Sequence, residues 1–203
     1  MTFVLFQGSY NSHEHLEKWW LPKFLENVAP LGHKILMPQL PVDDYDEVTA
    51  AGPQTTTKQN LEAWLAAFEN FYPQIDNEKE LVFVSHSLGP LFVLHVLEKY
   101  SISLDAAIFV CPFLEKLQKS DWQINLVNST FYKTDFDFAK LRKLVPISYV
   151  LYGTNDPYVE NSQSLSFAEK MGSSLVQVVG GGHLSKEKNV DLIVEMAKTR
   201  INL

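Results

Sequence analysis

The chain has 203 residues, 46% of them hydrophobic and 20% charged, which is ordinary for a soluble globular protein and long enough for a single domain over residues 1–203. Its formal net charge of −7 opposes binding to phosphate backbones and anionic lipids, so we expect neither a nucleic-acid partner nor a membrane partner. One cysteine excludes a disulfide framework, no apolar run approaches the ~20 residues of a membrane helix, and no basic signal region follows Met1, so a cytoplasmic location is predicted.

Apolar runs predict six strands along the chain, and patterns typical of helices separate them. The runs are continuous rather than alternating, as in a parallel sheet that helices cover on both faces. Between the second and third runs, hydrophobic residues from 61 to 72 recur at helical spacing. The sequence therefore predicts an α/β fold, a three-layer α/β/α sandwich around a mostly parallel six-stranded sheet. The predicted strands are residues 2–7, 34–37, 81–84, 106–110, 147–152 and 175–179.

Two stretches interrupt this alternation. Residues 41–57 hold four acidic residues and a Gly-Pro pair, and they are predicted to form a solvated loop. Residues 114–145 are the longest interval between strands and are rich in aromatic side chains. We expect one or two short helices there, packed over the end of the sheet as a small lid-like segment or pocket wall.

The third run leads into the sequence SHSLG at residues 85–89, followed by residues that are apolar nearly all round. A strand, a tight turn and a buried helix would place Ser87 at the apex, where a strained backbone exposes its hydroxyl group. The pattern is the nucleophile elbow G-x-S-x-G, with Ser85 in place of the first glycine. A serine at such a turn also has a simpler use as a helix cap, so this stretch alone leaves both interpretations open.

Two candidate partners for a nucleophilic serine follow later strands. A serine hydroxyl needs a general base, and the base needs an orienting carboxylate. Asp156 follows the fifth run, in the segment GTNDP, and His183 follows the sixth run after three glycines. Taken singly, Asp156 before a proline is equally explained as a turn former, and His183 as a helix cap. The order Ser, Asp, His and the placement of each at a strand end together favour a Ser-Asp-His triad.

These three motifs resemble those of the α/β-hydrolase superfamily across nearly the whole chain. The short length and the strand at the N-terminus are similar to the small serine hydrolases of the retinoblastoma-binding protein 9 type, and so is the histidine- and tryptophan-rich segment 13–25. The resemblance implies the strand order 2-1-3-4-5-6, without the leading antiparallel strands of the larger fold. It also implies a serine hydrolase in which Ser87 attacks, His183 is the base and Asp156 orients the imidazole.

The oxyanion formed by such an attack needs hydrogen-bond donors. The resemblance points to the backbone N–H of Leu88 and to a second donor in the loop after the first strand, at Gly8 or Ser9, with the N–H of Ser9 favoured. Gln7, where many hydrolases carry histidine, and Ser85 depart from the family pattern. Candidate pocket walls are His13, Trp20, Trp122 and Phe131.

The substrates expected are small carboxylic esters, because a short lid-like segment gives a long acyl chain little apolar wall. Two further interpretations are an amidase or peptidase acting on short substrates, and a non-catalytic protein-binding module on a hydrolase scaffold. A protein partner is compatible with the sequence but not indicated by it. No phosphate-binding or dinucleotide-binding glycine pattern is present, so no cofactor is expected. His13, His15 and His33 raise the alternative of a metal site, but no cysteine or acidic pair stands at ligand spacing, so no metal is expected.

Overall fold

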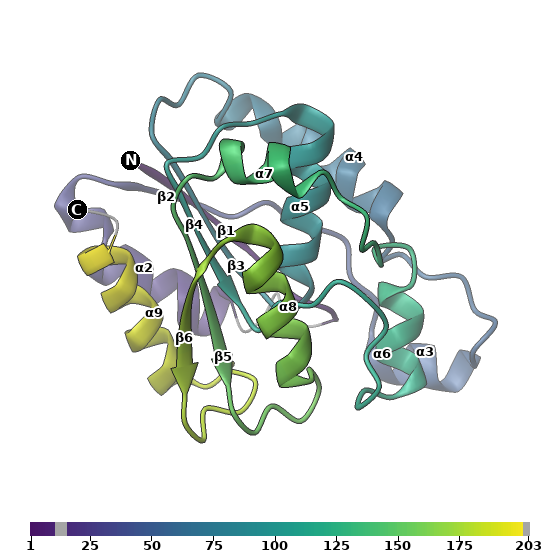
Figure 1. Cartoon of the computed structure of the whole chain (residues 1–203). Coiled ribbons are helices and arrows are strands. Elements are labelled where there is room, and N and C mark those ends of the chain that lie inside the picture. The colour runs from purple at the N-terminus through teal and green to yellow at the C-terminus, as the bar shows by residue number, and fades with distance from the viewer. Residues whose placement is uncertain (11–15, 201–203) are drawn as a thin grey trace.

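The computed structural model describes residues 1–10 and 16–200. Its centre is an open sheet of six strands, all parallel, in the order β2-β1-β3-β4-β5-β6 (Figure 1). The predicted strands, their parallel pairing and their order are confirmed, with ends that shift by one or two residues. The strands are β1 (Thr2–Phe6), β2 (Lys34–Leu36), β3 (Leu81–His86), β4 (Ala106–Val110), β5 (Ser148–Gly153) and β6 (Ser174–Val178).

Helices cover both faces of this sheet, so the three-layer architecture is confirmed (Figure 1). One face carries α4 (Leu61–Phe71), α5 (Leu88–Tyr100), α7 (Phe138–Leu144) and α8 (Asn161–Met171). The other carries the π-helical turn η1 (Leu16–Trp20), α2 (Leu21–Asn27) and α9 (Glu187–Arg200). Two 3-10 turns, η2 (Ala29–Leu31) and η3 (Tyr72–Gln74), follow α2 and α4.

The pleat of the central strands explains why both faces are apolar. In β1, Val4 and Phe6 join the core beneath α4 and α5, whereas Phe3 and Leu5 join the core beneath α2 and α9. Successive side chains of a strand point to opposite faces, so a strand between two helical layers must be hydrophobic at every position. This burial fixes the strands rigidly, and their C-terminal ends form a common edge on which side chains can be placed.

The prediction of a solvated loop over residues 41–57 is wrong at its centre, which forms α3 (Tyr45–Ala51). Asp44 caps this helix by accepting a hydrogen bond from the backbone N–H of Glu47 at 2.9 Å. Asp43 is only 8% exposed and accepts hydrogen bonds from the backbone of residues 58 and 59. Two of the four acidic residues that indicated a solvated loop, Asp43 and Asp44, therefore accept hydrogen bonds from the backbone, whereas Asp46 and Glu47 are exposed.

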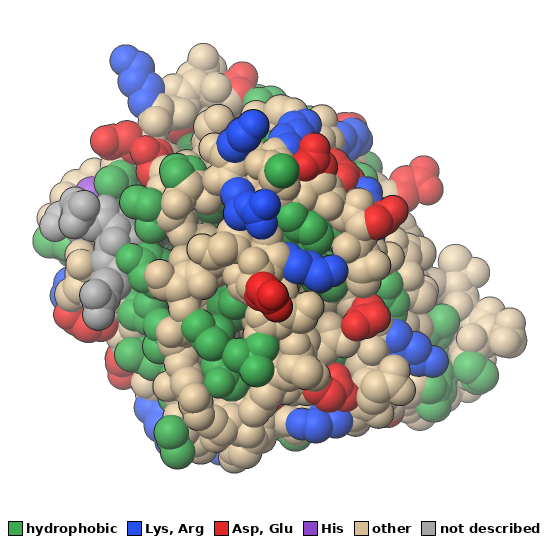
Figure 2. Space-filling model, viewed as in Figure 1, with side chains coloured by type: hydrophobic (Ala, Val, Ile, Leu, Met, Phe, Trp, Pro, Cys, Tyr) green, Lys and Arg blue, Asp and Glu red, His purple; other side chains and the backbone are tan. Residues whose placement is uncertain are grey.

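The two short helices expected within residues 114–145 are present as α6 (Trp122–Asn128) and α7. α6 lies beside α3, away from the bulk of the sheet, and α7 packs near α5 and α8 (Figure 1). On the face shown in Figure 2, acidic and basic side chains are interspersed rather than gathered by sign. Across the described part of the chain, no helix combines the length and the apolar character needed to cross a membrane.

Candidate active site

Ser87 occupies a sharp turn between β3 and α5. Its backbone has φ 59° and ψ −107°, a conformation that costs a non-glycine residue free energy and persists only where the surroundings enforce it. Its N–H donates to the carbonyl oxygen of Val110 at 2.8 Å, which holds the turn against the end of β4. Its side chain makes no capping hydrogen bond to α5. The alternative that Ser87 serves as a helix cap is therefore wrong.

Close packing around this turn requires small residues. A Cβ atom on Gly89 would lie 2.8 Å from the carbonyl oxygen of Gln7, and one on Gly8 would lie 2.7 Å from Cβ of Ser87. Ser85, where the elbow pattern has glycine, is fully buried in β3, with its Oγ 3.5 Å from the carbonyl oxygen of Ile108. The additional hydroxymethyl group therefore fits between β3 and β4 without displacing Ser87.

The structure brings Ser87, Asp156 and His183 together from the ends of β3, β5 and β6. Nε2 of His183 lies 3.0 Å from Oγ of Ser87, and its Nδ1 lies 2.7 Å from Oδ2 of Asp156. The loops that carry the last two residues are tied directly, because the N–H of Gly182 donates to Oδ1 of Asn155 at 2.8 Å. Gly153 has no room for a side chain, since a Cβ atom there would overlap the carbonyl oxygen of Gly182.

Asp156 is held as a carboxylate. It is 4% exposed, and its Oδ1 accepts hydrogen bonds from the N–H groups of Tyr158 at 2.9 Å and Val159 at 3.0 Å. Burial alone would raise the pKa of Asp156, but the hydrogen bond and charge of His183 and the two backbone donors together lower that pKa below its ordinary value. The charged form therefore faces the imidazole, where it favours the tautomer that carries its proton on Nδ1.

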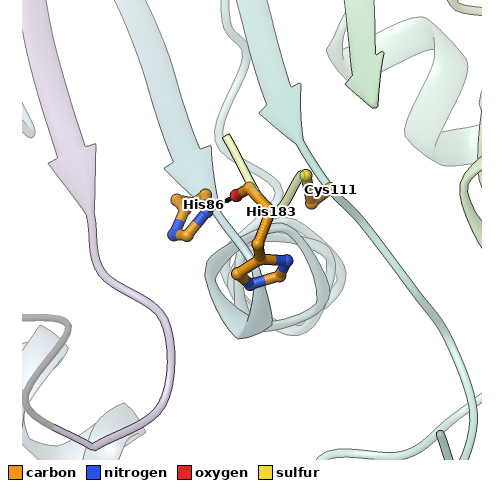
Figure 3. Close-up of side chains that lie close together, drawn as sticks. All are labelled: His86, Cys111 and His183. Atoms are coloured by element: carbon orange, nitrogen blue, oxygen red, sulfur yellow. Dashed lines mark hydrogen bonds between the residues drawn. The ribbon is translucent and has the colours of Figure 1, made fainter. Parts of the chain in front are cut away.

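His86 and Cys111 flank this arrangement at the ends of β3 and β4, on either side of His183 (Figure 3). Nε2 of His86 is 2.8 Å from the carbonyl oxygen of His183, and the two rings meet edge to face with centroids 4.7 Å apart. Each of these three residues has a possible ligand atom within 4.8 Å of the others. Both ring nitrogens of His183 already face Ser87 and Asp156, and burial beside Asp156 raises the pKa of the Cys111 thiol. The set therefore suits a hydrogen-bonded arrangement better than a metal site, which needs a thiolate.

The other metal alternative rested on three histidines. His13 and His15 lie outside the described residues. Nδ1 of His33 is 3.2 Å from the N-terminal amine, and burial and that positive charge lower its pKa.

A pocket of about 450 Å³ opens in front of Ser87. Tyr45 on α3 donates to Oδ2 of Asp121 at 2.7 Å across its rim, and the ring of Tyr158 stands edge-on to His183 with centroids 5.1 Å apart. The lining residues combine hydroxyl groups and aromatic rings with one carboxylate. They are Ser9, Tyr10, Tyr45, His86, Ser87, Leu117, Asp121, Ile124, Tyr158, His183 and Ser185.

Most of the aromatic pocket candidates lie elsewhere. Phe131 is fully buried, with ring contacts to Trp64 and Phe92 in the core beneath α4 and α5. Trp20 is buried behind His86, with ring centroids 5.5 Å apart, and Trp122 is 40% exposed. His13 lies outside the described residues. Three tyrosines and Asp121 take the place that these residues were expected to fill.

The positions expected to form an oxyanion site lie close to Ser87. Gly8 packs against the Ser87 side chain, and Ser9 lines the pocket. Leu88 is the first residue of α5, and the N–H groups of a first helical turn have no partner within the helix. Residues 8, 9 and 88 therefore lie beside Ser87, and an oxyanion role for their backbone N–H groups stays a prediction.

Comparisons with known proteins give a family match and a shared fold. A family model described as serine hydrolase matches residues 42–193, more than half of the chain. None of the curated proteins matches the sequence. Many solved structures share the fold.

One of these structures is the ydeN gene product from B. subtilis, with 19% identity, a TM-score of 0.76 and coverage of 100% of both chains. A predicted CIB-like hydrolase from Thermoplasma acidophilum has 19% identity and a TM-score of 0.63 over 100% of this chain and 86% of that one. Est1E from Butyrivibrio proteoclasticus, solved with ferulic acid bound, has 14% identity and a TM-score of 0.64 over 98% of this chain and 87% of that one. At these identities the likeness establishes the α/β-hydrolase fold.

Proposed function

The chain belongs to the serine hydrolase family, and from that premise we propose that it hydrolyses small carboxylic esters with Ser87 as nucleophile. The observation that carries the proposal is the continuous series of contacts from Oγ of Ser87 to His183 at 3.0 Å and from His183 to Asp156 at 2.7 Å. In a triad, the base must reach the hydroxyl proton and the carboxylate must fix the imidazole, and these distances suit both tasks.

In the proposed mechanism, Oγ of Ser87 attacks the ester carbonyl carbon while Nε2 of His183 takes the hydroxyl proton. The resulting oxyanion is stabilised by the backbone N–H groups of Leu88 and Ser9. The bond to the alcohol then breaks, and the imidazolium returns its proton to the leaving oxygen. A water molecule attacks the acyl-serine by the same steps, which releases the carboxylic acid and restores the serine. Asp156 stays ionised throughout and stabilises the imidazolium.

The size of the pocket supports a small substrate. Its volume of about 450 Å³ lies at the low end of the range for small-molecule sites, and α6 supplies only Ile124 as an apolar wall. We propose that the chain is a single domain and that residues 114–145 form its lid-like segment. Within this segment, α6 borders the pocket. Because every described strand is parallel, we also propose that the chain is of the retinoblastoma-binding protein 9 type.

The test is hydrolysis of p-nitrophenyl esters of increasing acyl length beside aminoacyl p-nitroanilides. We expect turnover of acetate and butyrate esters that Ser87→Ala abolishes and that Ser85→Ala, the matched neighbour, leaves within about tenfold. Preference for long acyl chains would contradict the small-ester proposal, and preference for the anilides would favour an amidase or peptidase. A folded protein that turns over none of them would favour the non-catalytic binding module.

A further inference from the structure

A buried set of polar side chains lies behind the loop that follows β1. We call Asp43, Gln59 and Asn128 the anchor network. Gln59 and Asn128 are fully buried and Asp43 is 8% exposed. The three residues come from distant parts of the chain, namely the segment before α3, the segment before α4 and the end of α6.

Hydrogen bonds connect this network to Ser9 and Tyr10. Oγ of Ser9 contacts Oδ1 of Asn128 at 2.6 Å, and Nε2 of Gln59 contacts the same oxygen at 3.2 Å. Oε1 of Gln59 accepts the N–H of Tyr10 at 2.9 Å. Both oxygens of Asp43 accept backbone N–H groups, including that of Gln59 at 2.8 Å, so the anchor is itself held in place.

The direction of every bond in this network follows from the backbone. The N–H of Tyr10 can only donate, so the oxygen of the Gln59 amide must face it and the nitrogen must face Asn128. Asn128 must then present its oxygen to Gln59. The same oxygen faces the Ser9 hydroxyl, which must therefore be the donor.

These hydrogen-bond directions determine which donor groups of the loop are left to bind an oxyanion. The hydroxyl hydrogen of Ser9 and the N–H of Tyr10 are both committed to the network, and neither can turn toward the pocket without breaking a hydrogen bond of that network. The N–H of Ser9 takes no part in the network. The loop also contains a strained residue, because Tyr10 has φ 53°, and such a backbone persists only where its surroundings over-determine it.

We propose that Gln59 and Asn128 are positioning residues that hold the Ser9 N–H in place as the second oxyanion donor. The proposal rests on the proposed function, because it assigns these residues to the acyl-transfer step at Ser87. Neither residue lines the pocket, so neither is expected to contact substrate. They act by holding the loop that carries the Ser9 N–H. Their effect on the rate is therefore expected in the transition state, where the oxyanion forms.

The experiment measures kcat and KM for p-nitrophenyl acetate in Asn128→Leu, Gln59→Leu and Ser9→Ala. Loss of one oxyanion donor costs about 10²–10³ in kcat, and a displaced donor should cost less, so we expect about a 10–100-fold fall in kcat for the two leucine variants with KM within about threefold. Ser9→Ala keeps the N–H and removes only its tether, so a smaller fall is expected. Ser9→Ala combined with Asn128→Leu should be no slower than Asn128→Leu alone, because both remove the same bond.

Ser148→Ala is the matched control. It removes a buried serine hydroxyl whose partner is Ser173 at 2.7 Å, at the opposite end of β5, so it should lower the melting temperature and leave kcat unchanged.

Variants of the network that fold and keep the wild-type kcat, or that raise KM as much as they lower kcat, would overturn the positioning role. So would a double variant whose losses multiply. If a leucine variant fails to fold, Ser9→Ala and Gln59→Glu, which keeps the acceptor for Tyr10, decide the question. A wild-type protein that shows no Ser87-dependent turnover would instead refute the proposed function itself.

Discussion

The two sides of the pocket are built in different ways. On the base side, Asp156 and His183 sit on short loops directly after β5 and β6, and backbone N–H groups a few residues away hold the carboxylate. On the side where we propose that the oxyanion binds, called the oxyanion side below, the loop after β1 is held by side chains from positions 59 and 128, far away in the sequence. One side is fixed by the sheet and its local turns, and the other by a long-range polar network. Variants on the two sides should therefore fail in different ways.

The largest effect is expected on the base side, from His183→Ala. Without a general base the serine hydroxyl is a weak nucleophile, so kcat for an acetate ester should fall about 10⁴-fold or more. His95→Ala is the matched control, since His95 contacts the carbonyl oxygen of Phe131 on the other face of the sheet and should leave kcat unchanged. A loss of less than about tenfold in His183→Ala would mean that the observed turnover uses another base.

On the oxyanion side, Gly8→Ala should cost about 10² or more in kcat, because the new Cβ atom would lie 2.7 Å from Cβ of Ser87 and must displace either the serine or the donor loop. Gly32→Ala provides the comparison. This variant also adds a methyl group at a glycine, but the position has open space around it and φ 90°. Gly32→Ala should therefore cost about 1 kcal/mol of stability and leave kcat unchanged. Equal kcat values for the two variants would contradict the close approach of Gly8 to the nucleophile.

A smaller effect is expected at the pocket rim. Among the described lining residues, Asp121 is the one acidic side chain, and no lysine or arginine accompanies it. Asp121→Asn should therefore lower the ratio of kcat/KM for a cationic ester over an anionic ester by about 3–10-fold, as expected for one partly solvated charge. Asp121 also caps α6, and Asp137→Asn is the control because Asp137 caps α7 in the same way but lies outside the pocket. An unchanged ratio in Asp121→Asn would show that the rim carboxylate does not contribute to substrate specificity.

The smallest effect concerns acid stability. The pKa of Asp156 is lower in the folded protein than its ordinary value, so the unfolded chain binds more protons between these two values. Its contribution to stability is therefore complete above the unfolded pKa of about 3.9 and is lost as the pH falls through the folded pKa. Urea unfolding of the wild type and Asp156→Asn between pH 3 and pH 6 should show a steeper acid loss in the wild type. Parallel curves would contradict the ionised, hydrogen-bonded state of Asp156.

The same contrast explains what the sequence could predict. Continuous apolar runs predicted both the strands and their burial. Because parallel strands must end at a common edge, Ser87, Asp156 and His183 could be predicted from their places after strands. The pocket could not be predicted in this way. Tyr45 and Asp121 meet only because α3 packs beside α6, and composition placed α3 in a loop. Gln59 and Asn128 carry no motif, since a buried amide acquires its role from partners that are distant in the sequence.

The central claim is that Ser87 is the nucleophile of a serine hydrolase, and active-site labelling tests it most directly. The protein is incubated with a fluorophosphonate, and the adduct is located by intact mass and peptide mapping in the wild type, Ser85→Ala and Ser87→Ala. We predict one adduct at Ser87 in the wild type and in Ser85→Ala, and none in Ser87→Ala. An adduct that persists in folded Ser87→Ala, or a folded wild-type protein that takes up no label, would contradict the claim.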